Sequence, residues 1–542
     1  MQTLLPSVED VFSDMDKGDK TSGRVPLCNS GLFSTSSAHE TANDDSRRAP
    51  AIRRQDIPIV LHKMAKVFES SSEGSAADST NPDTSAVVFD VDALRASFAA
   101  AKGAYPPHFV HCMAVKCCPL SFVVQLLLEE GFGVEAASFV ELYMGLAHGC
   151  PPELAVFDSP AKTDEELAMA LSKGVLVNVN SLDELDRIEL ILEGRMAASK
   201  LDKSKQSPAV APRVGIRLNP LVGFGAIAEL STAVPTSKFG VPATPQNLQA
   251  VVEAFRKWPW LVGLHSHVGS QGCSLEQLTQ GAAVISNVAD MVDAELGKGR
   301  VAVLDIGGGL PANYLSDEVT PTFQDHAAAL KKAAPQLFEN TKRQVITEFG
   351  RAMVAKMAFT VSKVEYVRDN LFSGHSQSGE APSVDTGSDA RATPDDSHQN
   401  EPSESSTPIC GGDQTLVIHV GADMFVRTAY RPQSFQHRFS LYGKEGEELS
   451  RPLCRTEVAG PLCFQGDYVV RGAELPRASA GDLLVIHDTG ANTFALFSRH
   501  CSRPTPAFYG YSIDKNGDLC LKMIKKKESI EEVARFWGPP VV

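Results

Sequence analysis

Residues 344–351 read Gln-Val-Ile-Thr-Glu-Phe-Gly-Arg, an apolar and β-branched run that ends in a carboxylate, a glycine and an arginine. It is the last of eight similar runs. The eight runs cover residues 109–115, 131–136, 154–159, 175–180, 213–219, 261–268, 301–307 and 344–350. Amphipathic stretches of helical period separate most of them, at 119–130, 138–148, 164–172, 181–194, 246–257, 274–296 and 322–339. This alternation predicts an α/β fold, a parallel (β/α)8 TIM barrel, with a doubly wound open sheet as the alternative.

The sequence pattern changes after residue 350. Short β-rich segments separated by Gly, Pro or Asp follow, at 360–367, 415–421, 467–472, 482–488 and 494–500. They predict a C-terminal antiparallel β domain. We therefore expect a barrel over 86–350 and a β domain over 351–542, to which residues 86–91 could contribute a strand.

Polar, low-complexity stretches flank and interrupt these domains. Residues 1–85 are expected to be a largely disordered extension with one short helix at 57–68. Residues 369–413, rich in Ser, Asp, Pro and Gly, are expected to be a disordered insertion, and residues 196–211 a shorter one.

Composition excludes several classes of partner. The formal net charge of the 542 residues is −15, which argues against nucleic acid and anionic membranes. Residues 369–413 hold nine acids and one arginine, a net charge of −8, so the rest of the chain is only mildly acidic.

Cysteine usage favours a reducing compartment. The 11 cysteines form no C-x-x-C pair, which disfavours zinc ribbons and disulfide scaffolds. The N-terminus lacks the pattern of a signal or transit peptide, and no apolar run is long enough to span a membrane. We expect a cytoplasmic protein.

Polar residues gather where the predicted strands end, and the active site of such a barrel lies at the carboxyl ends of its strands. They are Lys116, Glu135, Arg217, His267, the triplet Gly307-Gly308-Gly309, Glu348, Gly350 and Arg351.

Three of these residues predict a pyridoxal 5′-phosphate site. A lysine such as Lys116 forms a Schiff base with the cofactor aldehyde, and burial near cations would lower its pKa. Glu348 would keep the pyridine nitrogen protonated. Arg351 and the backbone N–H groups of the glycine triplet would bind the phosphate.

The segment His265-Ser266-His267-Val268-Gly269-Ser270 ends the sixth run. Alternation places the two histidines on one side, where an imidazole could stack on the cofactor ring and Ser270 could reach the phosphate. A zinc site would need a third ligand that the sequence does not clearly offer, so we predict no metal.

With these motifs in hand, the chain resembles the alanine-racemase-fold (fold type III) decarboxylases that act on ornithine, diaminopimelate and arginine. The resemblance covers about 86–370 and 414–515. It rests on AVKCC (114–118), GVEAASFVEL (133–142), SKFG (237–240), HSHVGSQ (265–271), LDIGGGLP (304–311), EFGR (348–351), GPLCFQGD (460–467) and the segment 489–507. HVGSQ and SRPTPA lean toward the diaminopimelate decarboxylase branch.

The resemblance implies further roles. Cys463 would reach the site of a partner subunit and help to return a proton, so a homodimer with shared active sites is implied. Arg427 would bind a substrate carboxylate, and Asn492 stands at a cofactor-contacting position.

The positions at which this chain differs from the diaminopimelate branch bear mainly on substrate binding. Phe464 replaces the usual Glu after the catalytic Cys, and Asn492 replaces a Tyr. Arg431 stands where a Tyr is expected, with Tyr430 one place early. Glu135 replaces a common Asp, and Phe349 replaces a Pro. Phe464 in place of a carboxylate disfavours a cationic substrate tail.

We therefore expect a decarboxylase of an amino acid, with diaminopimelate as the substrate implied by branch. An amino acid with a neutral or apolar tail, a racemase, and a non-catalytic regulatory pseudo-decarboxylase remain the alternatives.

Overall fold

The computed structural model describes residues 51–72, 82–201, 210–370 and 413–539. The disorder expected for 1–50 and 371–412, and for the middle of the two shorter links, lies outside the described residues. Residues 51–56, expected to be disordered, instead lead into the first helix through a short 3-10 turn, Arg54–Asp56.

Eight parallel strands close into a barrel, as predicted. The strands are β2 (Phe109–Ala114), β3 (Gly133–Ala136), β4 (Ala155–Phe157), β5 (Leu176–Val179), β6 (Arg213–Asn219), β8 (Leu261–His265), β9 (Val303–Asp305) and β10 (Gln344–Phe349). Each pairs in parallel with the next, and β10 returns to β2 with Glu348 opposite Cys112. The two-residue β7 (Val241–Pro242) extends β6. The alternative of an open sheet is wrong, because the first and last strands pair.

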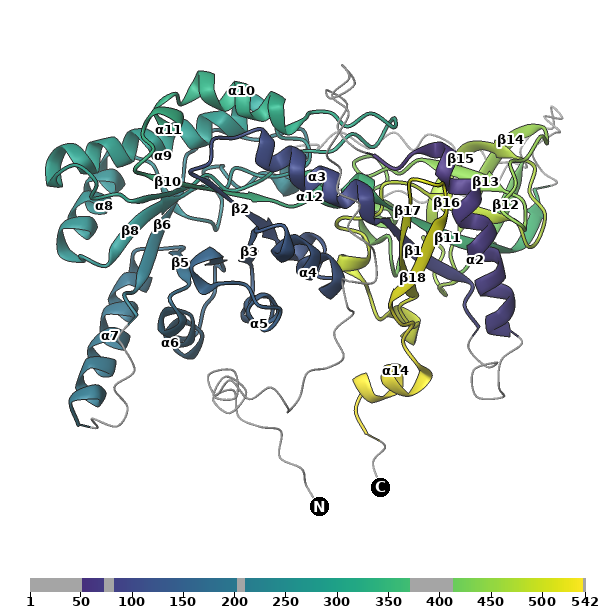
Figure 1. The fold of residues 1–542 in the computed structure, drawn as a ribbon, viewed down its shortest axis with the longest axis horizontal. Coiled ribbons are helices and arrows are strands. Elements are labelled where there is room, and N and C mark those ends of the chain that lie inside the picture. The colour runs from purple at the N-terminus through teal and green to yellow at the C-terminus, as the bar shows by residue number, and fades with distance from the viewer. Residues whose placement is uncertain (1–50, 73–81, 202–209, 371–412, 540–542) are drawn as a thin grey trace, which may run out of the picture.

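Helices cover the outside of the barrel (Figure 1). They are α3 (Val91–Gly103), α4 (Ser121–Glu129), α5 (Phe139–Ala147), α6 (Asp164–Lys173), α7 (Asp183–Leu201), α8 (Pro245–Lys257), α9 (Leu275–Leu296), α10 (Phe323–Ala333) and α11 (Gln336–Glu339). The short helix α12 (Arg351–Val354) instead follows β10 and leads to the β domain. Thr163 begins α6 with a capping box to Glu166, as its sequence indicates.

Two expectations about helices need correction. The helix expected over 322–339 is divided into α10 and α11, with Pro335 between them, because proline has no backbone N–H to continue a helix. Helix α7 runs to Leu201, so residues 196–201 are helical although we expected a flexible insertion from residue 196.

The second domain is a mixed sheet, mostly antiparallel. Its strands run in the order β15-β14-β12-β11-β1-β17-β18, with β16 bridging β11 and β13. Their bounds are β1 (Ser85–Asp90), β11 (Ala358–Asp369), β12 (Gln414–Ile418), β13 (Phe439–Tyr442), β14 (Leu453–Ala459), β15 (Tyr468–Pro476), β16 (Leu483–Ile486), β17 (Ala507–Ile513) and β18 (Leu519–Lys525). Helices α13 (Val426–Tyr430) and α14 (Ile530–Phe536) belong to this domain.

The pairing of this sheet departs from a purely antiparallel one at two places. Strand β1 pairs in parallel with β17, and β12 pairs in parallel with β14. The strand expected at 494–500 is absent: two 3-10 turns, Phe494–Leu496 and His500–Ser502, occupy this region. Cys501 and Ser502 adopt positive φ angles that interrupt an extended backbone.

Strand β1 ties the start of the barrel to the second domain. Ser85 pairs with Ser362 of β11, and Ala86 pairs with Ala507 of β17. In Figure 1 the purple β1 lies beside the yellow β17, although the two are more than 400 residues apart. Helix α3 then leads directly into the barrel.

Helix α2 (Ile57–Ser72) covers the outer face of this sheet (Figure 1). Its apolar face, which includes Val60, Leu61 and Met64, is fully buried against residues such as Phe359 and Val485. The helix is longer than the sequence indicated and is part of the folded β domain. Among the described residues, no helix has the length and apolar content needed to cross a membrane.

A buried polar cluster lies between β2, β10 and α10. The Tyr105 hydroxyl is 2.7 Å from Nδ1 of His326, and Nδ1 of His111 is 2.7 Å from Oγ1 of Thr347. The Phe349 ring packs against both imidazoles. Burial lowers the pKa of His111 and of His326 to about 4.

These histidines predict acid sensitivity. Their folded-state pKa lies below the unfolded value of about 6.5, so the unfolded chain binds protons first. The free energy of unfolding should fall as the pH drops from about 6.5 toward 4, by up to about 1.4 kcal/mol per pH unit for each histidine. Thermal unfolding at several pH values checks this. His326→Gln should show a shallower dependence, whereas the exposed-site change His500→Gln should not; equal slopes in all three proteins would contradict it.

Candidate active site

Lys116 lies in a 3-10 turn, Val115–Cys117, directly after β2. Its Nζ is 2.5 Å from Oε2 of Glu135, a buried residue of β3, and its side chain is 45% exposed. Burial tends to lower the pKa of Lys116, but the carboxylates of Glu135 and Glu348 outweigh it and raise the pKa above its ordinary value. The lowered pKa expected from the sequence is therefore wrong for this structure, because acids face the amine.

A series of buried contacts runs from Asp158, which lies just after β4, through His265 to Glu348. Oδ2 of Asp158 accepts from Nη1 of Arg217 at 2.8 Å, and its Oδ1 lies 3.7 Å from Nδ1 of His265. Nε2 of His265 lies 3.6 Å from Oε2 of Glu348. Despite its burial, the pKa of Asp158 is lowered by Arg217 and His265. The guanidinium of Arg217 also lies over the ring of Phe239.

Asp305, at the end of β9, adds a further carboxyl. Its oxygens accept from Nδ2 of Asn178 at 3.1 Å and from the backbone of Gly307 at 3.0 Å. Burial and the neighbouring Glu348 raise the pKa of Asp305 well above its usual range. The pKa of Glu348 is itself lowered: burial opposes this shift, but His265 holds the carboxylate ionised.

The part of the site around Lys116 thus contains more acidic side chains than cationic ones. Four buried carboxyl groups, Glu135, Asp158, Asp305 and Glu348, gather around Lys116 and Arg217, and the buried Lys162 adds a further positive charge near Asp158. Oε1 of Glu348 is buried without a hydrogen-bond partner. An additional cationic N–H group would satisfy this region.

Sequence reasoning assigned no role to Asp158, Asn178 or Asp305. Each lies at or next to the end of a barrel strand, which is the signal that could have found them. Strand-end position alone does not reveal that Asp158 pairs with Arg217, because β4 and β6 are separated by a whole β/α unit.

His267 lies two residues beyond β8 and faces the glycine loop. Its Nδ1 accepts from the backbone N–H of Gly308 at 3.2 Å. Burial and the cations Lys116 and Arg217 lower the pKa of His267 to about 3. The imidazole is therefore neutral, which suits stacking on a cationic ring. His265, on the end of β8, points instead into the acid cluster.

The glycine triplet allows a close approach of strand ends. A Cβ on Gly308 would lie 2.0 Å from the carbonyl oxygen of Glu348, and one on Gly309 would lie 2.3 Å from that of Gly269. The N–H groups of Gly307 and Gly308 already donate to Asp305 and His267. Two of the three N–H groups that were expected to bind the phosphate are therefore already engaged. The expectation can apply only to the N–H group of Gly309.

Two other small residues border this region. The backbone N–H of Ser270 donates to the carbonyl of Leu230 at 3.1 Å, so Ser270 is held in the loop after β8. A Cβ on Gly350 would lie 2.8 Å from Sγ of Cys117, so this glycine lets α12 start close to the Lys116 turn.

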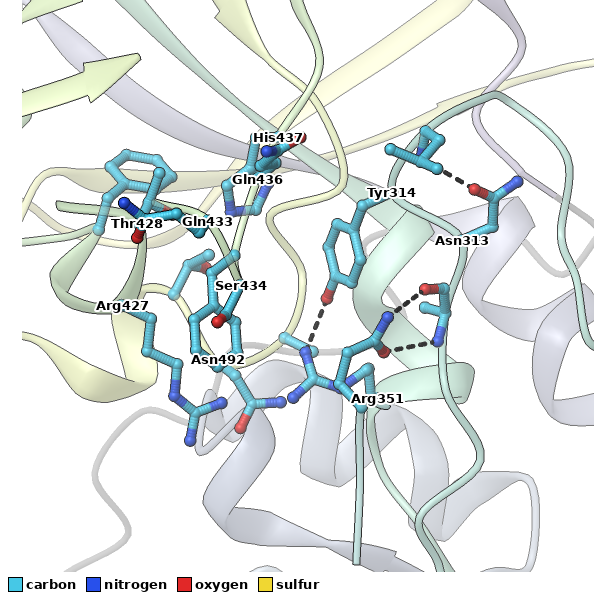
Figure 2. A pocket seen from close by; sticks show the side chains of 17 residues that line it. Asn313, Tyr314, Arg351, Arg427, Thr428, Gln433, Ser434, Gln436, His437 and Asn492 are labelled. Atoms are coloured by element: carbon cyan, nitrogen blue, oxygen red, sulfur yellow. Dashed lines mark hydrogen bonds between the residues drawn. The ribbon is translucent and has the colours of Figure 1, made fainter. Parts of the chain in front are cut away.

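A cavity of about 310 Å³ opens between the barrel and the β domain. Arg351, Arg427 and Asn492 line it, together with Tyr314, whose hydroxyl is 2.9 Å from Nη1 of Arg351 (Figure 2). Among the described residues, Nε of Arg351 and Nη1 of Arg427 are buried without a hydrogen-bond partner. The cavity end of the site is therefore suited to bind an anionic group.

Tyr430, Cys463 and Phe464 lie apart from that cavity lining. The rings of Tyr430 and Phe464 stack with centroids 5.8 Å apart, and His500 meets Phe464 edge-on. Tyr430 and Cys463 are exposed. Within one chain, the predicted site residues thus form two groups. One lies around Lys116 and the cavity, and the other consists of Tyr430, Cys463 and Phe464.

The two charged ends fit pyridoxal phosphate. The acid cluster suits its protonated ring nitrogen, and Arg351, whose Nε is buried without a partner among the described residues, suits its phosphate. Ligand atoms of Asp158, His265 and Glu348 also lie within 4.8 Å of one another, a spacing that could hold a metal ion. Arg217 already supplies Asp158 with a positive partner.

Comparisons with known proteins agree with this geometry. The model of the "Pyridoxal-dependent decarboxylase, pyridoxal binding domain" matches residues 91–355, and that of the "C-terminal sheet domain" matches 353–490. Diaminopimelate decarboxylase of Aquifex aeolicus is 26% identical over 448 residues, 82% of this chain and 90% of the relative. A probable chloroplastic diaminopimelate decarboxylase of rice is 26% identical over 77% of this chain and 71% of its own length.

Solved structures share the fold. Diaminopimelate decarboxylase from Helicobacter pylori complexed with L-lysine superposes with a TM-score of 0.65 at 21% identity, covering 84% of this chain and 98% of that one. A lysine/ornithine decarboxylase from Vibrio vulnificus gives 0.58 at 20% identity, covering 83% and 98%. With both domain models matched in order across a barrel and a sheet domain, this chain belongs to the pyridoxal-dependent decarboxylases of the ornithine, diaminopimelate and arginine family.

Proposed function

We propose that this chain releases CO2 from an α-amino acid related to diaminopimelate, at a site completed by a second subunit. The observation that supports it most is the contact between Lys116 and Glu135 beside Glu348, with Arg351, whose Nε has no partner among the described residues, at the other end of the site.

Each residue has a stated task in this proposal. Lys116 would be the attachment point of pyridoxal phosphate, Glu348 would hold the ring nitrogen, and Arg351 would bind the phosphate. His267 presents a neutral imidazole to the ring. When bound, the cofactor supplies an electron sink for the bond that loses CO2. The protein orients the substrate and excludes water around that bond.

Glu135 is suited to hold the proton that Lys116 must give up. Burial, Glu348 and Asp158 raise the pKa of Glu135 to about 8, although Lys116 opposes the shift. A carboxyl group with a pKa near the operating pH is present in both protonation states, and this one lies 2.5 Å from the amine.

Exposure of Cys463 and of its neighbours supports a homodimer with shared sites. Cys463 lies in the loop after β14, and the stacked pair of Tyr430 and Phe464 is adjacent to it. These side chains carry the resemblance to family substrate residues but do not line the cavity that holds Arg351. A partner subunit that inserts this loop would bring them to it.

Substrate identity is the open part of the proposal. The curated relatives quoted above are named for diaminopimelate, which has an amine and a carboxylate at its far end. Phe464 offers no charge to that amine. A racemase or a regulatory pseudo-decarboxylase remains a rival outcome of the tests below. The cytoplasmic location stays a prediction.

The first test concerns the attachment lysine. Lys116→Ala should abolish CO2 release and should leave no cofactor bound covalently after borohydride reduction, because no other amine faces Glu135 in the described site. Mass spectrometry of peptides and release of CO2 from a panel of amino acids measure this. Lys257→Ala, an exposed lysine paired with Asp186 and Glu189, is the matched control.

Three outcomes of this test would count against the proposal. Full activity of Lys116→Ala would overturn the role of the lysine. A wild-type protein that binds no cofactor would indicate a pseudo-decarboxylase. Exchange of the α-hydrogen with solvent, without CO2, would indicate a racemase.

Shared sites can be tested by mixing two inactive variants. Lys116→Ala and Cys463→Ala should each be weak alone. Mixed in equal amounts after subunit exchange, they should recover about a quarter of wild-type activity, because a mixed dimer has one site with both residues intact. No recovery, in a mixture that light scattering and exchange of labelled subunits prove to be mixed dimers, would refute a shared site.

The third test concerns the loop residue Phe464. Phe464→Glu should raise kcat/KM for substrates with a cationic tail relative to substrates with an apolar one, because a carboxylate would pair with the tail. Phe464→Leu controls for loss of the aromatic ring. An unchanged preference in Phe464→Glu would exclude Phe464 as a determinant of specificity.

A further inference from the structure

The cavity between the two domains carries uncompensated positive charge. Arg351 and Arg427 are both among its lining residues, and no Asp or Glu is. Its other polar walls are neutral, including Thr428, Gln433 and Ser434 (Figure 2). An occupant of this cavity should therefore bring negative charge.

Arg427 is the less satisfied of the two arginines. Its Nη1 is buried without a hydrogen-bond partner, and its guanidinium lies 5.3 Å from the ring centre of Phe435. Burial and the repulsion from Arg351 lower the pKa of Arg427, although Tyr314 opposes the shift. A buried guanidinium in these conditions gains most from a carboxylate, which can accept two hydrogen bonds from it.

The cofactor phosphate is not the best partner for Arg427. Arg351 begins α12 directly after the strand that carries Glu348, and it has its own buried, partnerless Nε. Arg427 belongs to α13 on the β-domain wall, and Asn492 lies between the two guanidinium groups in Figure 2. The two arginines thus come from different walls of the cavity.

The anion that pairs with Arg427 cannot be the carboxylate that leaves as CO2. A buried arginine would stabilise that carboxylate in the ground state, and the interaction would weaken as its charge moves away in the transition state. Arg427 is consequently better matched to a carboxylate at the far end of the substrate.

Within the part of the chain that the structure describes, neither the cavity lining nor the segment that carries Cys463 offers an acid to a second amine on the substrate. The segment that carries Cys463, residues 460–466, reads Gly-Pro-Leu-Cys-Phe-Gln-Gly and contains no carboxylate. Asp467, which follows, is buried and accepts from the backbone N–H groups of Ala422 and Leu462, both at 2.6 Å. An ammonium group in this region would remain unpaired.

We propose that the preferred substrate is a monoamino dicarboxylic acid, whose far carboxylate pairs with Arg427 and whose tail has no second amine. This inference rests on the proposed function and specifies its substrate class. It differs from diaminopimelate by the absence of the distal amine, and from an apolar-tailed amino acid by the presence of the distal carboxylate.

The experiment measures CO2 release by the full chain loaded with pyridoxal phosphate. Substrates are glutamate, 2-aminoadipate and 2-aminopimelate, which vary in length, beside meso-diaminopimelate, lysine and norleucine. The kcat/KM of the best dicarboxylate should exceed that of meso-diaminopimelate, and it should exceed that of norleucine by about 100-fold or more.

A substitution separates substrate binding from cofactor binding. Arg427→Met should lower kcat/KM for the best dicarboxylate by about 100-fold, mainly through KM, while the cofactor content stays near wild type. Arg256→Met, on the exposed face of α8 and paired with Glu253 and Glu295, is the matched control.

Each other outcome has a distinct meaning. Preference for meso-diaminopimelate or for norleucine would overturn the inference and leave decarboxylation intact. Loss of cofactor from Arg427→Met would assign Arg427 to the phosphate and also overturn it. No CO2 from any substrate by a cofactor-loaded protein would instead overturn the proposed function.

Discussion

The site depends on a separation of charge that the fold holds in place. At one end, four buried carboxyl groups surround Lys116 and Arg217, and at the other, Arg351 and Arg427 face a cavity without acids. Such groups are costly to bury unless they meet opposite charges. Pyridoxal phosphate, with a protonated nitrogen at one end and a phosphate at the other, matches the two ends in sign.

Close packing of the strand ends keeps that separation. Gly308 lies against the backbone of Glu348 so closely that any side chain would displace it, and Gly350 brings α12 against the Lys116 turn. The acid on the last strand and the amine beyond the first are thus fixed by backbone contacts, because β10 pairs with β2 to close the barrel. The resulting pre-organisation allows the site to act without rearranging its charges.

The β domain contributes one wall of the cavity and the exposed loop of Cys463. Strand β1 and helix α2 come from the N-terminal part of the chain, yet they pack into this domain rather than onto the barrel. The two domains are therefore interleaved along the chain. Strand β1 and helix α3, which follow one another without a break, join the β domain to the barrel.

Local sequence was sufficient for the eight-fold β/α alternation, for the sheet domain, and for Lys116, Glu348 and Arg351 at strand ends, because period and strand position are local properties. Tertiary structure alone decided the rest. It set the raised pKa of Lys116, the pairing of Asp158 with Arg217, the burial of His265 between two acids, and the parallel pairing of β1 with β17. It also put turns where a strand was expected near residue 500. Charge interactions and strand pairing join residues far apart in the chain, so neither can be obtained from any single stretch of it.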